Sequence, residues 1–170
     1  MRPGWPTVAA LLVAMFLQAS IAPHLAVFGV VPNLFLLVVV TLALVEGPVP
    51  GAFAGFTAGV LLDMLGTSVI GPWALVLCVV GYVAGTLNAN MFAEGWLLPI
   101  TVAFMASLLA ELSYGLLLAV LGVGGPFVVT LTHIVVPATV YNTALAVLVY
   151  PWLARLLRQD PGMTEFRRMA

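Results

Sequence analysis

The side chains that could do chemistry are few, and each stands inside or at the end of a long apolar segment. The four that stand out are Gln18, Asp63, Glu111 and His133. An ionisable group in such a segment is costly to bury, so it marks a candidate functional site by default. Glu111 has Ser107 one turn before it and Tyr114 three residues after it, which places a polar stripe on one helix face. A carboxyl group there is either protonated or paired.

The motifs of common enzymes are missing from the sequence. It has no paired-His or Cys/His metal spacing, no Ser/His/Asp order in a supporting context, and no glycine-rich phosphate loop followed by Lys. An aspartyl pair built from Asp63 and Glu111 lacks the paired motifs of intramembrane proteases. We therefore predict a protein that is not an enzyme and that holds no metal and no cofactor.

The composition requires a lipid environment. The chain is 64% hydrophobic and 6% charged, whereas a water-soluble surface is roughly a quarter to a third charged residues. No Lys or Arg lies between Pro3 and Ala154, and the basic residues are Arg2, Arg155, Arg158, Arg167 and Arg168. The positive-inside rule then predicts a membrane topology with both termini cytoplasmic. Residues 1–154 form one polytopic transmembrane domain and 155–170 a short basic cytoplasmic tail, which can touch anionic lipid but not nucleic acid.

Proline, glycine and polar residues divide the apolar region into about six transmembrane helices, an all-α integral membrane fold. The expected spans are Trp5–Ala22, Pro32–Glu46, Gly51–Leu65, Trp73–Asn88, Trp96–Leu121 and Phe127–Trp152, the last bent at Pro137. Gly47–Pro50 is expected to be a tight turn, and residues 90–95 a polar turn with Glu94. The second and third spans are short, so a re-entrant hairpin with four full spans stays an alternative. Tryptophans at the span ends are expected to anchor at the membrane interface.

This topology places the four polar side chains at one depth. With the N-terminus inside, Gln18, Asp63, Glu111 and His133 all fall in the outer half of the membrane. Two interpretations follow: a polar cavity open to the outside or a hydrogen-bond cluster, and separate polar groups that are each satisfied within the bundle. Asp63 in particular could serve a helix end or the turn after it.

The third span carries glycines four residues apart, Gly51, Gly55 and Gly59, with Asp63 on the same face. In lipid, small residues permit close backbone contact between helices. The face could pack against another span of this chain, as could the Gly81 and Gly85 pair in the fourth span, or it could bind a partner helix.

The run from Pro32 to Leu75 resembles the rod shape-determining protein MreD family. Pro32-Asn33-Leu34 opens the second span, Gly55-Phe56-x2-Gly59-x-Leu61-Leu62-Asp63 follows, and Gly71-Pro72-Trp73-Ala74-Leu75 begins the next helix. The family's usual acidic residue after that first proline is Asn33 in this chain, and Asn88 and Asn90 stand where members often carry Arg. The resemblance implies a fold similar to that of the substrate-binding subunits of energy-coupling factor transporters.

The same resemblance implies a non-enzymatic role in bacterial cell elongation and peptidoglycan synthesis. Its expected partner is MreC, a bitopic protein, and through it the cytoskeletal MreB, the synthase RodA and a class B penicillin-binding protein; self-association stays open. Gly55, Gly59 and Asp63 are the residues expected to hold the partner. The alternative is a small-molecule-binding subunit of a vitamin-type transporter, favoured by the shared depth of the four polar residues.

Overall fold

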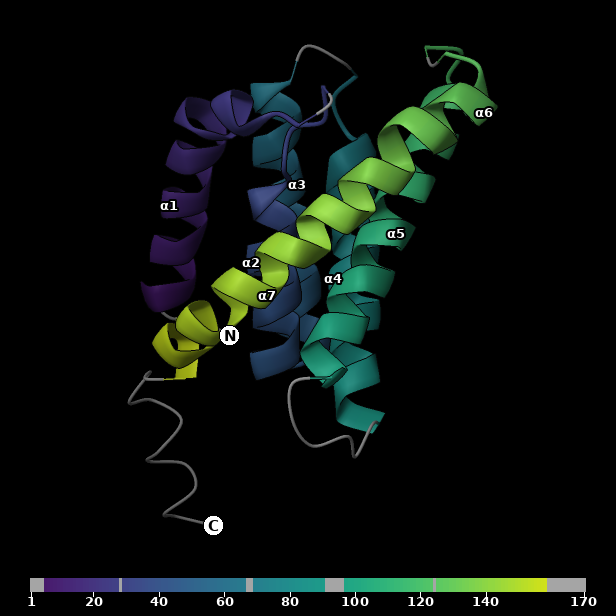
Figure 1. Cartoon of the computed structure of the whole chain (residues 1–170). Coiled ribbons are helices and arrows are strands. Elements are labelled where there is room, and N and C mark those ends of the chain that lie inside the picture. Colours follow the sequence, from purple (N-terminus) through teal and green to yellow (C-terminus); the bar gives the residue numbers. More distant parts are fainter. Residues whose placement is uncertain (1–4, 28, 67–68, 91–96, 124, 159–170) are drawn as a thin grey trace, which may run out of the picture.

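The computed structural model describes residues 5–27, 29–66, 69–90, 97–123 and 125–158, and within them nearly all of the chain is helical. The elements are α1 (Trp5–Ser20), a 3-10 helix (Ala22–Leu25), α2 (Leu34–Glu46), α3 (Pro48–Leu65), α4 (Pro72–Asn90), α5 (Leu97–Val120), α6 (Phe127–Thr130), a π-helical segment (Leu131–Val135) and α7 (Val136–Arg158). Figure 1 shows them as a bundle in which α1 lies beside α2 and α7 runs diagonally across it.

The helices run alternately up and down the bundle. The beginning of α1 and the end of α7 both lie at the lower end in Figure 1, while the segments after α1, α3 and α5 lie at the upper end. The two ends of the described chain therefore lie at the same end of the bundle (Figure 1). This arrangement was expected from the sequence, because the arginines at both ends of the chain were predicted to lie on one side of the membrane. Of the predicted polar turn, Asn90 is the last residue of α4, while residues 91–95 with Glu94 lie outside the described residues, as does the end of the basic tail.

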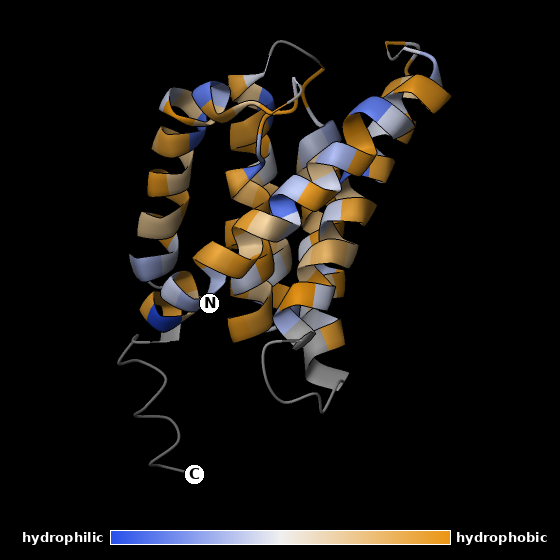
Figure 2. Ribbon diagram, in the orientation of Figure 1, coloured by the Kyte–Doolittle hydropathy of each residue, from blue (hydrophilic) through white to orange (hydrophobic). Residues whose placement is uncertain are grey.

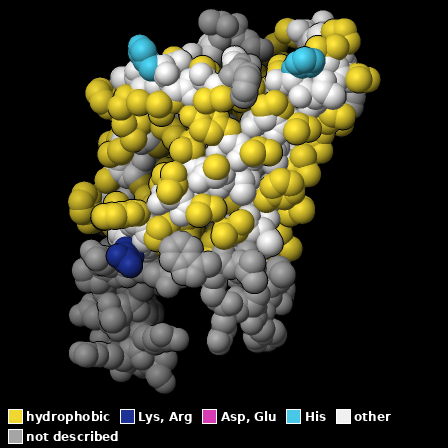
Figure 3. All heavy atoms as spheres, in the orientation of Figure 1, with side chains coloured by type: hydrophobic (Ala, Val, Ile, Leu, Met, Phe, Trp, Pro, Cys, Tyr) yellow, Lys and Arg dark blue, Asp and Glu magenta, His cyan; other side chains and the backbone are white. Residues whose placement is uncertain are grey.

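Three helical stretches are long and apolar enough to cross a membrane by length and composition: Pro48–Leu65, Pro99–Val120 and Val128–Leu157. The apolar helices Trp5–Ser20, Leu34–Glu46 and Pro72–Leu87 are shorter. Figure 2 shows orange, apolar ribbon on every helix, and in Figure 3 apolar side chains cover most of the visible face. The cyan histidine side chains lie near the upper end and the dark blue basic side chain lies near the lower end.

Helix α2 is the centre of the bundle. Every residue from Phe35 to Leu44 is buried, and the helix contacts α1, α3, α4, α5 and α7. A helix that is hydrophobic all round has no side suited to water, so it packs well only when neighbours surround it. Asn33 is the N-cap residue just before this helix, and its Oδ1 accepts a hydrogen bond from the Leu36 N–H over 3.0 Å.

The predicted turn at Gly47–Pro50 is wrong, because α3 already begins at Pro48 and only Gly47 separates it from α2. Prolines at the start of a helix remove N–H groups that have no partner within the helix anyway. Gly47 has φ +97°, a backbone conformation that residues with a side chain rarely adopt, and its N–H donates to the Ala43 carbonyl. One glycine is therefore enough to reverse the chain between two packed helices.

The last span differs from a simple helix before Pro137. Residues Leu131–Val135 form a π-helical turn, in which the Val136 N–H donates to the Leu131 carbonyl five residues earlier. Proline lacks the N–H that a regular helix would use at its position, and a wider turn just before it is one way to continue the helix. The helix then runs on to Arg158, beyond the predicted end at Trp152.

Candidate functional site

The glycine face of α3 lies against α4 of the same chain. A Cβ added to Gly55 would overlap the carbonyl oxygen of Leu77, and one added to Gly51 would lie 2.6 Å from the carbonyl oxygen of Gly81. Gly59 meets the backbone of Trp73 and Ala74 in the same way. These contacts are between backbones, so no flexible side chain can move aside.

Helix α4 contributes glycines of its own to the same contact with α3. A Cβ on Gly81 would overlap the Gly51 carbonyl, and one on Gly85 would lie 2.5 Å from the Pro48 Cα. Of the two interpretations of the α3 glycines, the structure therefore shows packing against another helix of the same chain. The partner-helix interpretation of this face does not fit, because α4 already occupies it.

Asp63 extends the same α3–α4 contact at its upper end. Its Oδ2 accepts hydrogen bonds from the N–H groups of Gly71 (2.9 Å) and Ala74 (3.1 Å), and its Oδ1 accepts one from the Trp73 N–H (3.2 Å). The first N–H groups of a helix have no partner within it, and a carboxylate there also favours the positive end of the helix dipole. Asp63 thus caps α4, and its side chain is buried.

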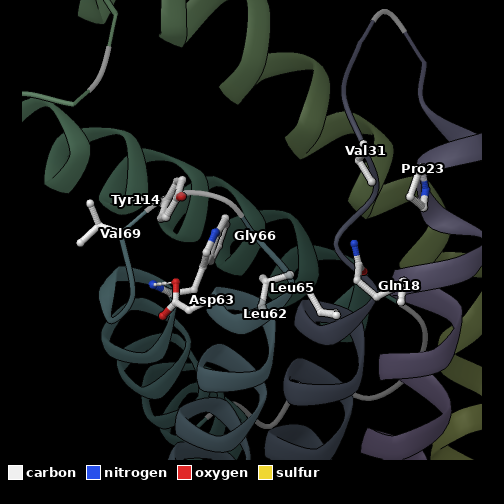
Figure 4. Close-up of a pocket in the computed structure, with 11 residues that line it drawn as sticks. Gln18, Pro23, Val31, Leu62, Asp63, Leu65, Gly66, Val69 and Tyr114 are labelled. Atoms are coloured by element: carbon white, nitrogen blue, oxygen red, sulfur yellow. Dashed lines mark hydrogen bonds between the residues drawn. The ribbon is translucent and has the colours of Figure 1, made fainter.

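A cavity of about 430 Å³ adjoins this cap at the upper end of the bundle. We call it the upper cavity; its main lining residues are Gln18, Pro23, Val31, Asp63, Trp73 and Tyr114. In Figure 4 Asp63 and Tyr114 lie on one side of it and Gln18 and Pro23 on the other. The Trp73 and Tyr114 rings are stacked, with centroids 4.1 Å apart and planes 17° from parallel.

Gln18 connects the end of α1 to the chain segment that leads into α2. Its Nε2 donates to the Pro32 carbonyl over 3.0 Å, and its Oε1 accepts from the Leu34 N–H over 2.8 Å. Both ends of the amide are therefore used to hold backbone groups near the first turn of α2. Gln18 lines the upper cavity, but its polar atoms serve the fold.

Glu111 belongs to a second set of polar groups, centred on Asn142. The Asn142 Oδ1 accepts from the Asn33 N–H over 2.9 Å, and its Nδ2 donates to Ser107 Oγ over 3.2 Å and to Glu111 Oε1 over 3.4 Å. Asn33, Ser107, Glu111 and Asn142 are all buried. This polar chain ties α7 to α5 and to the start of α2.

His133 lies apart from both sets. It is on the π-helical segment and its side chain is exposed. The four residues expected at one depth are thus distributed over three places: Gln18 and Asp63 share the upper cavity, Glu111 is in the buried polar chain, and His133 is on the surface. No group of three His, Cys, Asp or Glu side chains that could hold a metal ion is found in the part of the chain that the structure describes.

Sequence reasoning missed Asn142, which makes three hydrogen bonds to other helices or their caps. The signal was available, since a side-chain amide inside an apolar span commonly hydrogen-bonds to neighbouring helices. Trp73 was expected at the membrane interface, like Trp5 and Trp152. The latter two are exposed, Trp5 at the first residue of α1 and Trp152 inside α7, whereas the Trp73 ring is half-buried against Tyr114.

The helices and these two polar sets define a small helical membrane protein whose buried polar groups mostly hold helices together. The chain belongs to the rod shape-determining protein MreD family, whose family model matches residues 4–159. No curated protein and no solved structure matches the chain. The expected likeness to the substrate-binding subunits of energy-coupling factor transporters, and the transporter alternative with it, stay predictions.

Proposed function

We propose that this chain is a non-enzymatic membrane scaffold of the bacterial cell-elongation machinery, which binds MreC and helps couple MreB to the synthase RodA and a class B penicillin-binding protein. The observation that carries this proposal is the match of residues 4–159 to the MreD family model, because this is a family of rod shape-determining proteins. The scaffold crosses the plasma membrane several times.

The orientation that we propose puts the lower end of the bundle in the cytoplasm. Arg155 lies near the end of α7, at the same end as the start of α1. Basic residues are retained on the cytoplasmic side of membranes. The upper cavity would then face the outside.

The surface that we propose for MreC is a groove between α1 and α3, which we call the lower groove. Its volume is about 430 Å³, and it is lined by Thr7, Val8, Leu11, Leu12, Leu42, Glu46, Pro50, Phe53, Ala54, Thr57 and Leu61. It extends along about two turns of α1, from Thr7 to Leu12, and about three turns of α3, from Pro50 to Leu61. Phe53 and Leu12, on opposite walls, are exposed.

A spanning helix of MreC suits this groove better than the flatter faces of the bundle. Lipid tails are as apolar as leucine, so association in a membrane depends on van der Waals contact and on hydrogen bonds. A hollow surrounds an inserted side chain on several sides and so provides more such contacts than a convex face. The glycine faces of α3 and α4 are already used within the chain.

The test is co-expression of this chain with MreC from the same genome, followed by detergent purification and size-exclusion chromatography. We expect a stoichiometric complex with the native chain. Thr57→Trp should abolish it, because Thr57 lines the groove with an exposed side chain that a large ring would replace.

The matched control is Val140→Trp, which adds the same ring to an exposed position on α7, away from the groove. It should leave the complex intact. A folded native chain that never elutes with MreC would contradict the scaffold proposal. A complex that survives Thr57→Trp but not Val140→Trp would move the contact to α7.

A further inference from the structure

The upper cavity has a chemistry of its own, which the scaffold role does not use. Two half-buried aromatic rings, Trp73 and Tyr114, form part of its wall. Within the described residues, neither the indole N–H nor the phenol O–H makes a hydrogen bond to another side chain or to backbone. Both rings also carry the negative π face that attracts cations.

The Asp63 carboxylate adds an acceptor to the same wall. Three backbone N–H groups donate to it, two to Oδ2 and one to Oδ1. A carboxylate can accept about four hydrogen bonds. The α4 cap uses two positions on Oδ2 and one on Oδ1, so one acceptor position on Oδ1 is not used by the cap. Asp63 lines the cavity, where a donor on a bound molecule could take this position.

The charge of the cavity is negative. The N-terminus of α4 contributes roughly half of a positive charge against the full negative charge of the carboxylate. No Lys or Arg occurs between Pro3 and Ala154, so none can line the cavity. His24 follows the lining residue Pro23 in the sequence, but it is not part of the lining, and its Nδ1 lies 3.0 Å from the Ser20 carbonyl.

We propose that the upper cavity is a binding site for an organic ammonium group. Aromatic faces beside a carboxylate are the combination that recognises primary and quaternary ammonium ions. The volume of about 430 Å³ is that of a small-ligand pocket. The same charge excludes phosphates and other anions that lack an ammonium group.

Two sources could supply the ammonium group. One is the ethanolamine headgroup of a phospholipid in the leaflet around the upper end of the bundle, and the other is a soluble amine. Both carry a positively charged nitrogen, so a single ammonium compound can test whether the cavity binds this group. A comparison of two lipid compositions then distinguishes the headgroup from the soluble amine.

The probe is choline, added to the full chain in nanodiscs of phosphatidylglycerol. Trp5→Phe, Trp96→Phe and Trp152→Phe leave Trp73 as the single fluorescent tryptophan. Choline should change Trp73 emission saturably and raise the melting temperature, because it binds only the folded state. Neohexanol, the neutral isostere in which carbon replaces the ammonium nitrogen, should do neither.

Two variants locate the site. Asp63→Asn keeps an oxygen for the α4 cap but removes the charge, and Tyr114→Leu removes one ring; each should weaken choline binding about tenfold. Tyr82→Leu is the control, since Tyr82 is exposed on α4 outside the cavity. Because Asp63 is on α3 and Tyr114 is on α5, the misfolding of one variant leaves the other as a test.

The lipid comparison repeats the titration in nanodiscs that contain phosphatidylethanolamine. Weaker apparent choline binding there would identify the headgroup as the occupant, and unchanged binding would identify a soluble amine; both results support an ammonium site. An equal response to neohexanol, or no response to choline in phosphatidylglycerol nanodiscs, would overturn the proposal. Neither result depends on whether MreC binds the lower groove.

Discussion

Helices α3 and α4 are joined in a different way from α1 and the rest of the bundle. Along α3 and α4 glycine backbones touch from the Gly51–Gly81 contact to the Asp63 cap. Helix α1 instead has a hollow on each side: the lower groove toward α3, and a smaller one of about 220 Å³ toward α7. Side-chain hydrogen bonds hold α1 near its two ends, from Thr7 to Glu46 and from Gln18 to the start of α2.

The difference shows two solutions to the same problem. Between helices in lipid, the hydrophobic effect supplies little attraction, so stability comes from close packing or from polar contacts. The α3–α4 pair uses continuous packing, and α1 uses a few hydrogen bonds. We therefore expect the α3–α4 pair to be the rigid part of the molecule and α1 to be the part that separates first.

The largest effect should come from Gly55→Ala. The new Cβ would overlap the Leu77 carbonyl, so the two backbones must move apart, at a cost of about 1–3 kcal/mol or more. Thermal unfolding in detergent, followed by size-exclusion chromatography, should show a melting temperature several degrees lower.

Gly115→Ala provides the matched control, since its Cβ would lie 3.4 Å from Thr130 Cγ2, near an ordinary contact distance. It should leave the melting temperature unchanged or raise it slightly, as alanine favours helix. Equal losses for Gly55→Ala and Gly115→Ala would mean that the α3–α4 contact is not specially close.

Asp63→Ala should have the next largest effect. It leaves three N–H groups at the start of α4 without their acceptor, and the loss of a helix cap costs about 1–2 kcal/mol. Asp63→Asn, which keeps one oxygen, should lose less. Chemical or thermal unfolding measures both variants; a melting temperature for Asp63→Ala equal to that of the native chain would rule out the capping role.

Gln18→Leu should have the smallest effect on global stability and a local effect on α1. Hydrogen bonds between helices in membranes contribute on average about 0.6 kcal/mol, and the variant loses those to Pro32 and Leu34. Hydrogen exchange of the Leu34 amide and of the last turn of α1 should become faster, while exchange in α4 stays the same. Met15→Leu, on the exposed side of α1, is the control; faster exchange throughout α4 would contradict the comparison.

Much of the helical layout could be predicted from the sequence, since apolar runs and their breaks locate α1 to α5 within a few residues. The prediction at Gly47–Pro50 was wrong because Pro48 and Pro50 were interpreted as residues of a turn. Proline is equally suited to the first turn of a helix, and only the position of α4 against Pro48 and Gly51 decides between them.

The polar groups were harder to predict than the helices. Glu111 and Gln18 could be recognised as notable, but depth along a helix does not give its rotation. Asn142 hydrogen-bonds to Glu111 and also to Asn33, which is 109 residues away from Asn142 in the sequence. No pattern in a single sequence reports such a pairing. Asp63 was placed at a helix end by its spacing, yet its acceptor role for α4 depends on how the two helices cross.

The unequal helix lengths have a consequence for the surrounding bilayer. Helix α1 has 16 residues and is about 24 Å long, whereas the continuous apolar stretch through α7 has 30 residues and is about 45 Å long. In the topology that we propose, with a hydrocarbon core of about 30 Å, lipids would compress beside α1 while the longer stretch would tilt. The protein would then have a thin side and a thick side, and membrane neighbours with short spans would relieve the most elastic strain by gathering beside α1.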